Sequence, residues 1–272
     1  MPIKAVFLIS QAFQYVQALE ARNARGYKPE ECAIICFHKP YHRQEQQLES
    51  VLDPNNWGFS KLIKYPKFWP PFKSDTTFFQ RIKKHTTKLT SAYTVAREVN
   101  KIMKETCTIP LELVATGDYM SRPHRHVLAK AEQKYATDEI MVMDEGTATH
   151  YYVVPLRHCH DAPKEAKNYK WRFTKKDIAG ILLKWLTGFT FNHPKKVTFF
   201  TVYKDIHPPK TDRVEHNAFS FLRQRLQNFK QTEQIWFIGT CYVELGHMNK
   251  SDFHKILTTA LKDAQGQKVL YF

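Results

Sequence analysis

The chain has 272 residues, of which 43% are hydrophobic, so it is long enough to bury one large core or two medium ones. Its 19 phenylalanines and 13 tyrosines exclude a disordered chain, and no apolar run approaches the ~18 residues of a membrane-spanning helix. The formal net charge of +15 indicates an anionic partner: a nucleotide, an acidic glycan, an anionic membrane surface or nucleic acid.

The cysteines indicate a reducing compartment. There are five, and their spacing is not that of a disulfide framework. Cys32 and Cys36 fall on one face of an expected strand, which is typical of buried free thiols. We therefore expect a cytoplasmic protein.

The N-terminal stretch predicts a β-α-β unit. An apolar segment over 3–9 is expected to be a core strand, because no small-residue cleavage site of a signal peptide follows it. A helix then runs to about Arg25 and ends at Gly26, and a second strand covers 31–37. This alternation predicts a parallel sheet.

The next stretch, 38–85, is expected to be irregular and is strongly basic. Basic and aromatic residues alternate in it, which suits nucleic acid binding by stacking and phosphate contacts. The same composition suits docking on an anionic membrane surface. We favour a third interpretation, a connecting loop with solvated lysines. The basic residues are Lys61, Lys64, Lys67, Lys73, Arg81, Lys83 and Lys84.

A helix over 86–105 and a strand over 111–116 follow, with Gly117 at the carboxyl end of that strand. Ser121 is then expected to cap a further helix that has Pro123 in its first turn. Basic side chains gather at the positive end of this helix, which makes it a natural anion site. These side chains are Arg122, His124, Arg125 and His126.

The strand over 140–143 ends in Asp144, Glu145 and Gly146. In open α/β sheets, ligands collect at the carboxyl ends of the strands. A carboxylate held there can act as a general base on a hydroxyl group, and a glycine lets a ligand approach the backbone. The alternative is a solvated turn at the end of a strand.

The second half of the chain repeats the alternation. The run Arg157-His158-Cys159-His160-Asp161 lacks a second pair of ligands at the spacing of a zinc site, so we expect no metal. We predict two Rossmann-like β/α domains of a GT-B-like α/β fold, 1–190 and 191–272, which face a cleft. The further elements expected are a helix over 178–186, a strand over 197–203, a helix over 215–229, a strand over 234–238, a helix over 251–262 and a strand over 268–272.

Four stretches in order resemble the bacterial lipooligosaccharide sialyltransferases and polysialyltransferases, which are GT-B enzymes that transfer sialic acid from CMP-sialic acid. The resemblance covers most of the chain. It rests on Ile9-Ser-Gln-Ala-Phe-Gln14 with Gln17-Ala-Leu-Glu-Ala21, on Gly117-Asp-Tyr-Met-Ser121 with Arg125-His126, on Asp144-Glu-Gly-Thr147, and on Phe200-Thr-Val-Tyr203 with Phe237-Ile-Gly239 and Val243-Glu244.

The resemblance implies roles for particular residues. Asp144 would be the general base on the acceptor hydroxyl, and Glu145 would support it or replace it. Positive or protonated groups would stabilise the leaving phosphate, so that no metal cofactor is required. The donor or its anionic groups would be bound by Gly146, Thr147, Arg125, His126, Gly239, Thr240 and Glu244.

The family also has a His-Pro pair after a strand of its C-terminal domain. The strand that resembles this position ends at Phe272, so we expect the second domain to be incomplete. One such dipeptide, His193-Pro194, lies instead at the predicted domain junction. It is either the functional pair or a proline that fixes a linker.

These features predict an inverting, metal-independent sialyltransferase that uses CMP-sialic acid and builds a bacterial surface glycan, lipooligosaccharide or capsule. Its expected partners are the nucleotide-sugar donor, a glycan acceptor and the anionic surface of the inner membrane, with no specific nucleic acid. Two alternatives stay open: a GT-B transferase with another nucleotide-sugar donor, and an inactive or partial member that acts as a basic binding protein.

Overall fold

The computed structural model describes residues 2–38, 42–64, 78–144, 149–161, 192–227, 234–237, 249–260 and 268–271. The chain forms two compact units, Met1–Arg223 and Gln224–Phe272.

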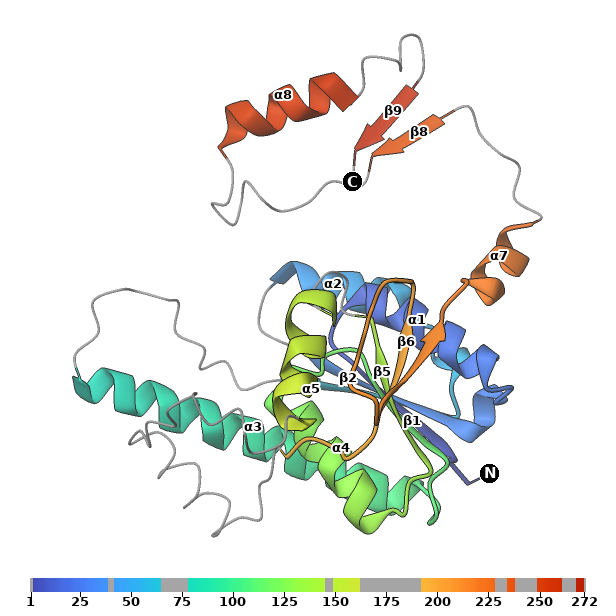
Figure 1. The fold of residues 1–272 in the computed structure, drawn as a ribbon, viewed down its shortest axis with the longest axis vertical. Helices are drawn as coiled ribbons and strands as arrows, with labels where there is room; N and C mark the ends of the chain where they lie inside the picture. The colour runs from blue at the N-terminus through green and yellow to red at the C-terminus, as the bar shows by residue number, and fades with distance from the viewer. Residues whose placement is uncertain are drawn as a thin grey trace. The chain divides into compact units, whose positions relative to one another are not determined.

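A parallel sheet is the centre of the first unit (Figure 1). Its seven described strands lie in the order β3-β2-β1-β4-β5-β6-β7, and each neighbouring pair is parallel. The central strands are continuous apolar runs because helices cover both faces of the sheet. The α/β fold class predicted from the sequence is therefore confirmed. The strands are β1 (Ala5–Ile9), β2 (Cys32–His38), β3 (Phe59–Lys64), β4 (Leu113–Thr116), β5 (Glu139–Met143), β6 (Thr198–Thr201) and β7 (Arg213–His216).

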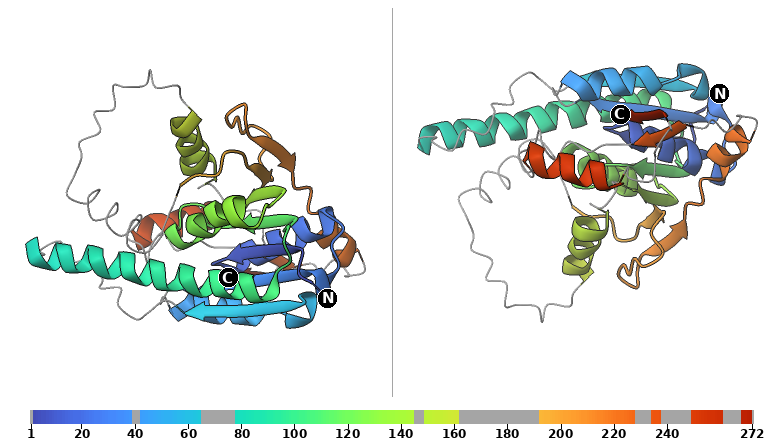
Figure 2. Two further views of the ribbon diagram at one scale, coloured as in Figure 1. Left: turned by 90° about the horizontal axis from the view of Figure 1, so that it is seen from below. Right: turned by 90° about the horizontal axis from the view of Figure 1, so that it is seen from above.

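Helices pack on both faces of the sheet and make three layers (Figures 1 and 2). Side chains alternate between faces along each strand. Ala5, Phe7 and Ile9 of β1 pack under α1 (Ala12–Ala24) and α2 (His42–Val51). Val6 and Leu8 pack under α3 (Phe78–Thr106) and α4 (Arg122–Lys134), and Figure 2 shows the long α3 extending past the sheet. Cys32 and Cys36 are buried free thiols, as expected.

The strand order reverses between β1 and β4. The chain runs outward from β1 through β2 to β3, then returns to pair β4 with the other side of β1. The two halves of the sheet therefore diverge at the carboxyl ends of β1 and β4. In sheets of this kind, that divergence opens the crevice where ligands bind.

Two predictions about the elements of the first unit are wrong. The stretch 38–85, expected to be irregular, contains α2 and the edge strand β3. The residues Arg213–His216 form the edge strand β7, where the start of a helix was expected. Edge strands bury little, so their sequences lack the apolar run that marks β1 or β5.

The predicted domain boundary at 190/191 also needs correction. β6 pairs with β5 in parallel register, Met141 opposite Thr198, and β7 pairs with β6. The strands expected to begin a second domain therefore complete the first sheet, and the first unit extends to Arg223.

The remaining described elements of the first unit are mostly short. They are the 3₁₀ turns η1 (Pro29–Glu31) and η2 (Pro54–Asn56), the π-helix η3 (Thr149–Val153), α5 (Val154–Asp161) and the beginning of α7 (Ser220–Leu226), which the unit boundary crosses. In the second unit, β8 (Gln234–Phe237) and β9 (Lys268–Tyr271) pair in parallel and are connected through α8 (Lys250–Ala260). This β-α-β order matches the predicted strands and helix. The helix expected over 178–186 lies outside the described residues.

Within the ranges that the structure describes, no helix is both long enough and apolar enough to cross a membrane.

Candidate functional site

The switch point brings together two stretches that are far apart in the sequence. Ser10 follows β1 and Gly117 follows β4. The Gln14 side chain joins them, because its Oε1 accepts the Ser10 N–H at 2.7 Å and its Nε2 donates to the Gly117 carbonyl at 2.5 Å. The Gly117 N–H also donates to the Leu8 carbonyl at 2.9 Å. The first two stretches of the family resemblance therefore form one structure at the crevice of the sheet.

Gly117 is required here for space. A Cβ atom at this position would lie 2.6 Å from Gln14 Cγ, closer than two carbon atoms can pack. Any side chain would displace Gln14 and break its bonds to both loops. The glycine at the end of β4 thus leaves the space that the Gln14 side chain occupies between the two loops.

His124 is a buried residue of this crevice that the sequence prediction included only as part of a basic cluster. Its Nε2 lies 3.3 Å from Ser10 Oγ and its Nδ1 lies 2.8 Å from Thr116 Oγ1. Its ring also packs against Phe37, with 4.3 Å between the centroids. The imidazole therefore ties α4 to the ends of β1 and β4. The only signal for it in the sequence is a hydroxyl residue at the end of each strand.

Asp144 follows β5 at the same edge of the sheet, and its side chain is fully buried. Oδ2 accepts the backbone N–H of Val202, just after β6, at 2.7 Å, while Oδ1 has no hydrogen-bond partner among the residues that the structure describes. Burial raises the pKa of this carboxyl group, and hydrogen bonds from Thr201, Val202 and Thr149 oppose the shift. The alternative of a solvated turn residue is therefore excluded for Asp144.

An imidazole and a phenol belong to the segments that follow β5 and β6. His150 belongs to η3, and its Nδ1 is buried without a hydrogen-bond partner in the part of the chain that the structure describes. Tyr203 follows β6, and its ring centroid lies 6.4 Å from that of His150. Burial raises the pKa of the Tyr203 phenol, and the negative charge of Asp144 raises it further. The segments after β5 and β6 thus carry a desolvated acid, an imidazole and a phenol.

Arg125 and His126 point to different neighbours, as adjacent residues on a helix do. Arg125 is buried enough that desolvation lowers its pKa, and its guanidinium lies 3.3 Å from His193 Nε2. His126 is buried, and its Nε2 lies 2.8 Å from the side-chain amide of Asn100 on α3. The structure therefore does not bring His126 to the group that Arg125 contacts.

The dipeptide His193-Pro194 is held in the first unit. His193 Nδ1 lies 2.6 Å from the hydroxyl of Tyr119, in the loop after β4. Because the guanidinium of Arg125 only donates, Nε2 of His193 is the acceptor, and Nδ1 carries the proton that is donated to Tyr119. The dipeptide thus belongs to the same edge of the sheet as Gly117.

Arg157 anchors this dipeptide from α5. It donates to the Pro194 carbonyl at 2.6 Å and to the Lys195 carbonyl at 3.3 Å. It also pairs with Asp212, with both side chains almost completely buried (1% and 0% exposed) and bonds of 2.8 and 2.6 Å. This buried bidentate ion pair joins α5 to the connection between β6 and β7.

Six predicted site residues lie outside the described residues, so their roles remain predictions. They are Glu145, Gly146, Thr147, Gly239, Thr240 and Glu244. Among the residues that are described, no group of three or more His, Cys, Asp or Glu side chains is placed to hold a metal ion.

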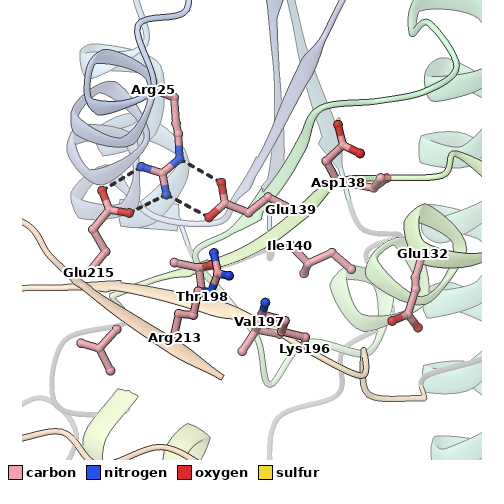
Figure 3. Close-up of a pocket in the computed structure, with 12 residues that line it drawn as sticks. Arg25, Glu132, Asp138, Glu139, Ile140, Lys196, Val197, Thr198, Arg213 and Glu215 are labelled. Carbon is pink, nitrogen blue, oxygen red and sulfur yellow. Dashed lines mark hydrogen bonds and ion pairs between the residues drawn. The ribbon is translucent and has the colours of Figure 1, made fainter. Parts of the chain in front are cut away.

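A cavity of about 530 Å³ lies at the opposite edge of the sheet (Figure 3). Arg25 lines this cavity and forms ion pairs with Glu139 at 2.8 Å and with Glu215 at 2.5 Å. Glu139 begins β5 and Asp144 follows its end, so the cavity is about 16 Å from the candidate base at ~3.3 Å per residue. We interpret the ion pairs that line this cavity as structural contacts, which hold the end of α1 to β5 and β7.

No family model matches the sequence. No curated protein matches it either. Among solved structures, the chain is similar to MurG of Acinetobacter baumannii over 99% of its own length and 68% of that chain, with 11% identity and a TM-score of 0.39. It is also similar to UGT2 of Phytolacca americana, which was solved with UDP-2-fluoro-glucose and pterostilbene. This match covers 88% of the chain and 60% of the other, with 10% identity and a TM-score of 0.43.

Proposed function

We propose that the chain is a glycosyltransferase of the GT-B class that transfers sialic acid from CMP-sialic acid to a bacterial surface glycan, with inversion. The observation that carries the proposal is the state of Asp144. One of its carboxylate oxygens is fixed by the Val202 N–H, and the other is buried at the edge of the sheet where ligands bind, with no hydrogen-bond partner in the described ranges.

In this reaction the acceptor hydroxyl attacks the anomeric carbon of the donor. A new carbon–oxygen bond forms, the bond to the phosphate of CMP breaks, and the hydroxyl proton goes to a base. Oδ1 of Asp144 is the oxygen available to take it, because Oδ2 is occupied by Val202. Burial raises the pKa of the carboxyl group, which makes it a stronger base than a solvated aspartate.

The leaving CMP carries negative charge on its phosphate. Arg125 supplies a positive charge close to the loop that follows β4. Its neighbour His193 contacts Tyr119 through Nδ1 and Arg125 through Nε2, and a bound phosphate would replace the contact with Arg125. Backbone approach at Gly146, Thr147, Gly239 and Thr240, and ribose binding by Glu244, belong to the same proposal. So do a cytoplasmic location and a peripheral contact of the basic surface with the inner membrane.

The test is nucleotide release and sugar transfer with purified protein. CMP-sialic acid is compared with UDP-glucose and UDP-N-acetylglucosamine, each with and without lactose or a sialic acid trimer as acceptor. We expect CMP release and sialylated product only from CMP-sialic acid. Release of UDP instead would indicate another donor, and no transfer from any donor would overturn the enzymatic proposal.

A non-catalytic basic binding protein is the second candidate, favoured by the net charge of +15. This candidate does not explain the buried carboxylate of Asp144, only one of whose oxygens is hydrogen-bonded among the described residues. A group of this kind lowers stability, so a function would be expected to maintain it. The two candidates separate in a nucleic acid titration across salt concentrations. Tight, steeply salt-dependent binding without any transfer would favour the binding protein.

A further inference from the structure

Two tyrosines of η3 are exposed close to the Asp144 turn. Tyr151 is 68% exposed and Tyr152 is 64% exposed. Tyrosine combines a broad apolar face with a hydrogen-bonding tip, and exposed aromatic side chains that adjoin a polar centre are typical of ligand-binding surfaces. They also lie on a π-helix, a rare form that is frequently found at functional sites.

Among the residues that the structure describes, ring contacts connect Tyr151 toward the Asp144 segment and do not include Tyr152. Tyr151 packs edge-on against His150, with ring centroids 5.1 Å apart, and His150 in turn lies 6.4 Å from Tyr203. Asp144 is joined to the Tyr203 segment by geometry, because its Oδ2 accepts the N–H of Val202, the residue before Tyr203, at 2.7 Å. Tyr151, His150, Tyr203 and Asp144 are therefore contiguous, and Tyr152 stands outside this group.

Two buried polar atoms of this group have no hydrogen-bond partner among the described residues. Oδ1 of Asp144 accepts a hydrogen bond, and Nδ1 of His150 can accept or donate one. Buried polar atoms of this kind are rare unless a ligand or water satisfies them. Here they lie beside exposed aromatic faces, so the ligand that fits has hydroxyl groups on its rim and an apolar C–H face. A saccharide ring has this chemistry.

We propose that Tyr151, His150 and Tyr203 form the subsite for the acceptor saccharide, which stacks on Tyr151 and presents one hydroxyl group to Asp144. This inference rests on the proposed function, because it takes Asp144 as the base. A second hydroxyl group of the same ring bonds to Nδ1 of His150, which orients the attacking oxygen. The donor nucleotide occupies the other side of the crevice, toward Arg125.

The test compares Tyr151→Ala with Tyr152→Ala, a neighbour of the same residue type and similar exposure. Binding of lactose and of a sialic acid trimer to the full chain is titrated without donor, by calorimetry or saturation-transfer NMR. We expect Tyr151→Ala to weaken acceptor binding roughly tenfold, the effect of one aromatic stacking contact, and Tyr152→Ala to leave it unchanged. The variant Tyr151→Phe, which keeps the ring, should bind like the parent.

Kinetics provide the second measurement. Tyr151→Ala should raise the KM for the acceptor and leave the KM for CMP-sialic acid unchanged. Equal effects of the two alanine variants, a rise in the donor KM instead, or no binding of either saccharide to the parent would overturn the subsite. If the parent binds saccharide through Tyr151 but transfers from no donor, the proposed reaction fails while the subsite stands.

Discussion

Replacing Arg157 with methionine tests how the His193-Pro194 segment is held. Methionine keeps much of the buried volume of the side chain but removes its charge. The variant leaves Asp212 buried without a countercharge and leaves the Pro194 and Lys195 carbonyls without their donor. Removing one partner of a buried ion pair costs about 3–5 kcal/mol, and we expect a loss of this size in the free energy of unfolding.

The assay is equilibrium urea unfolding followed by far-UV circular dichroism. An exposed arginine, Arg97 on α3, supplies the control: Arg97→Met should change stability by less than ~0.5 kcal/mol. The double variant Arg157→Met, Asp212→Asn removes the orphaned charge while keeping an oxygen for the Val197 N–H, so it should recover roughly 2 kcal/mol. A loss below ~1 kcal/mol for the single variant, or no recovery in the double variant, would refute this reasoning.

Three further predictions concern packing, charge and thiol reactivity. Gly117→Ala should cost about 1–3 kcal/mol, because its Cβ would lie 2.6 Å from Gln14; a cost below ~0.5 kcal/mol in the same urea assay would mean that the glutamine yields freely. Arg25→Ala should cost about 1 kcal/mol at low salt and less in 1 M NaCl, since its ion pairs are partly exposed; an effect insensitive to salt would argue against an electrostatic origin. Burial raises the pKa of Cys32 and Cys36 to about 12, so both should react with iodoacetamide only after unfolding; labelling of either in the folded protein at pH 8, found by peptide mass spectrometry, would contradict this.

The sequence was sufficient for the strands whose two faces are buried. β1, β2, β4 and β5 are mainly apolar, with polar residues only at their ends, and each was predicted within two residues. The two edge strands were missed for the opposite reason, because β3 and β7 bury little. The domain boundary was misplaced because an apolar strand such as β6 does not reveal which sheet it joins. The sheet that β6 joins is decided by its pairing with β5, from which it is separated by a long stretch of the sequence.

The candidate site was predictable only where a side chain that can act chemically comes directly after a predicted strand. Asp144 has such a position, and its burial at the edge of the sheet agrees with the expectation. His124 and Tyr151 depend on contacts between segments that are distant in sequence or on a π-helix, neither of which has a periodic signal. The different neighbours of Arg125 and His126 likewise appear only once α4 packs against α3 and the His193 segment.

The central claim concerns the purpose of the buried Asp144 carboxylate. Burial raises its pKa above the usual 3.8, so the folded protein keeps this proton at pH values where the unfolded chain has lost it. The free energy of unfolding therefore decreases as the pH rises from 3.8 through the raised pKa, and the full cost of the charge is present above it. An asparagine at this position avoids that cost and keeps an oxygen for the Val202 N–H.

The most direct measurement is made on Asp144→Asn: sialic acid transfer and urea unfolding in the same preparation at pH 7.5, with unfolding repeated at lower pH. We predict that transfer falls at least ~100-fold, the contribution of a general base, while the free energy of unfolding is unchanged or larger. Any gain in stability should shrink toward pH 3.8. Retained transfer, or lost transfer accompanied by a loss of stability, would contradict the account, since the latter is the behaviour of a structural anchor.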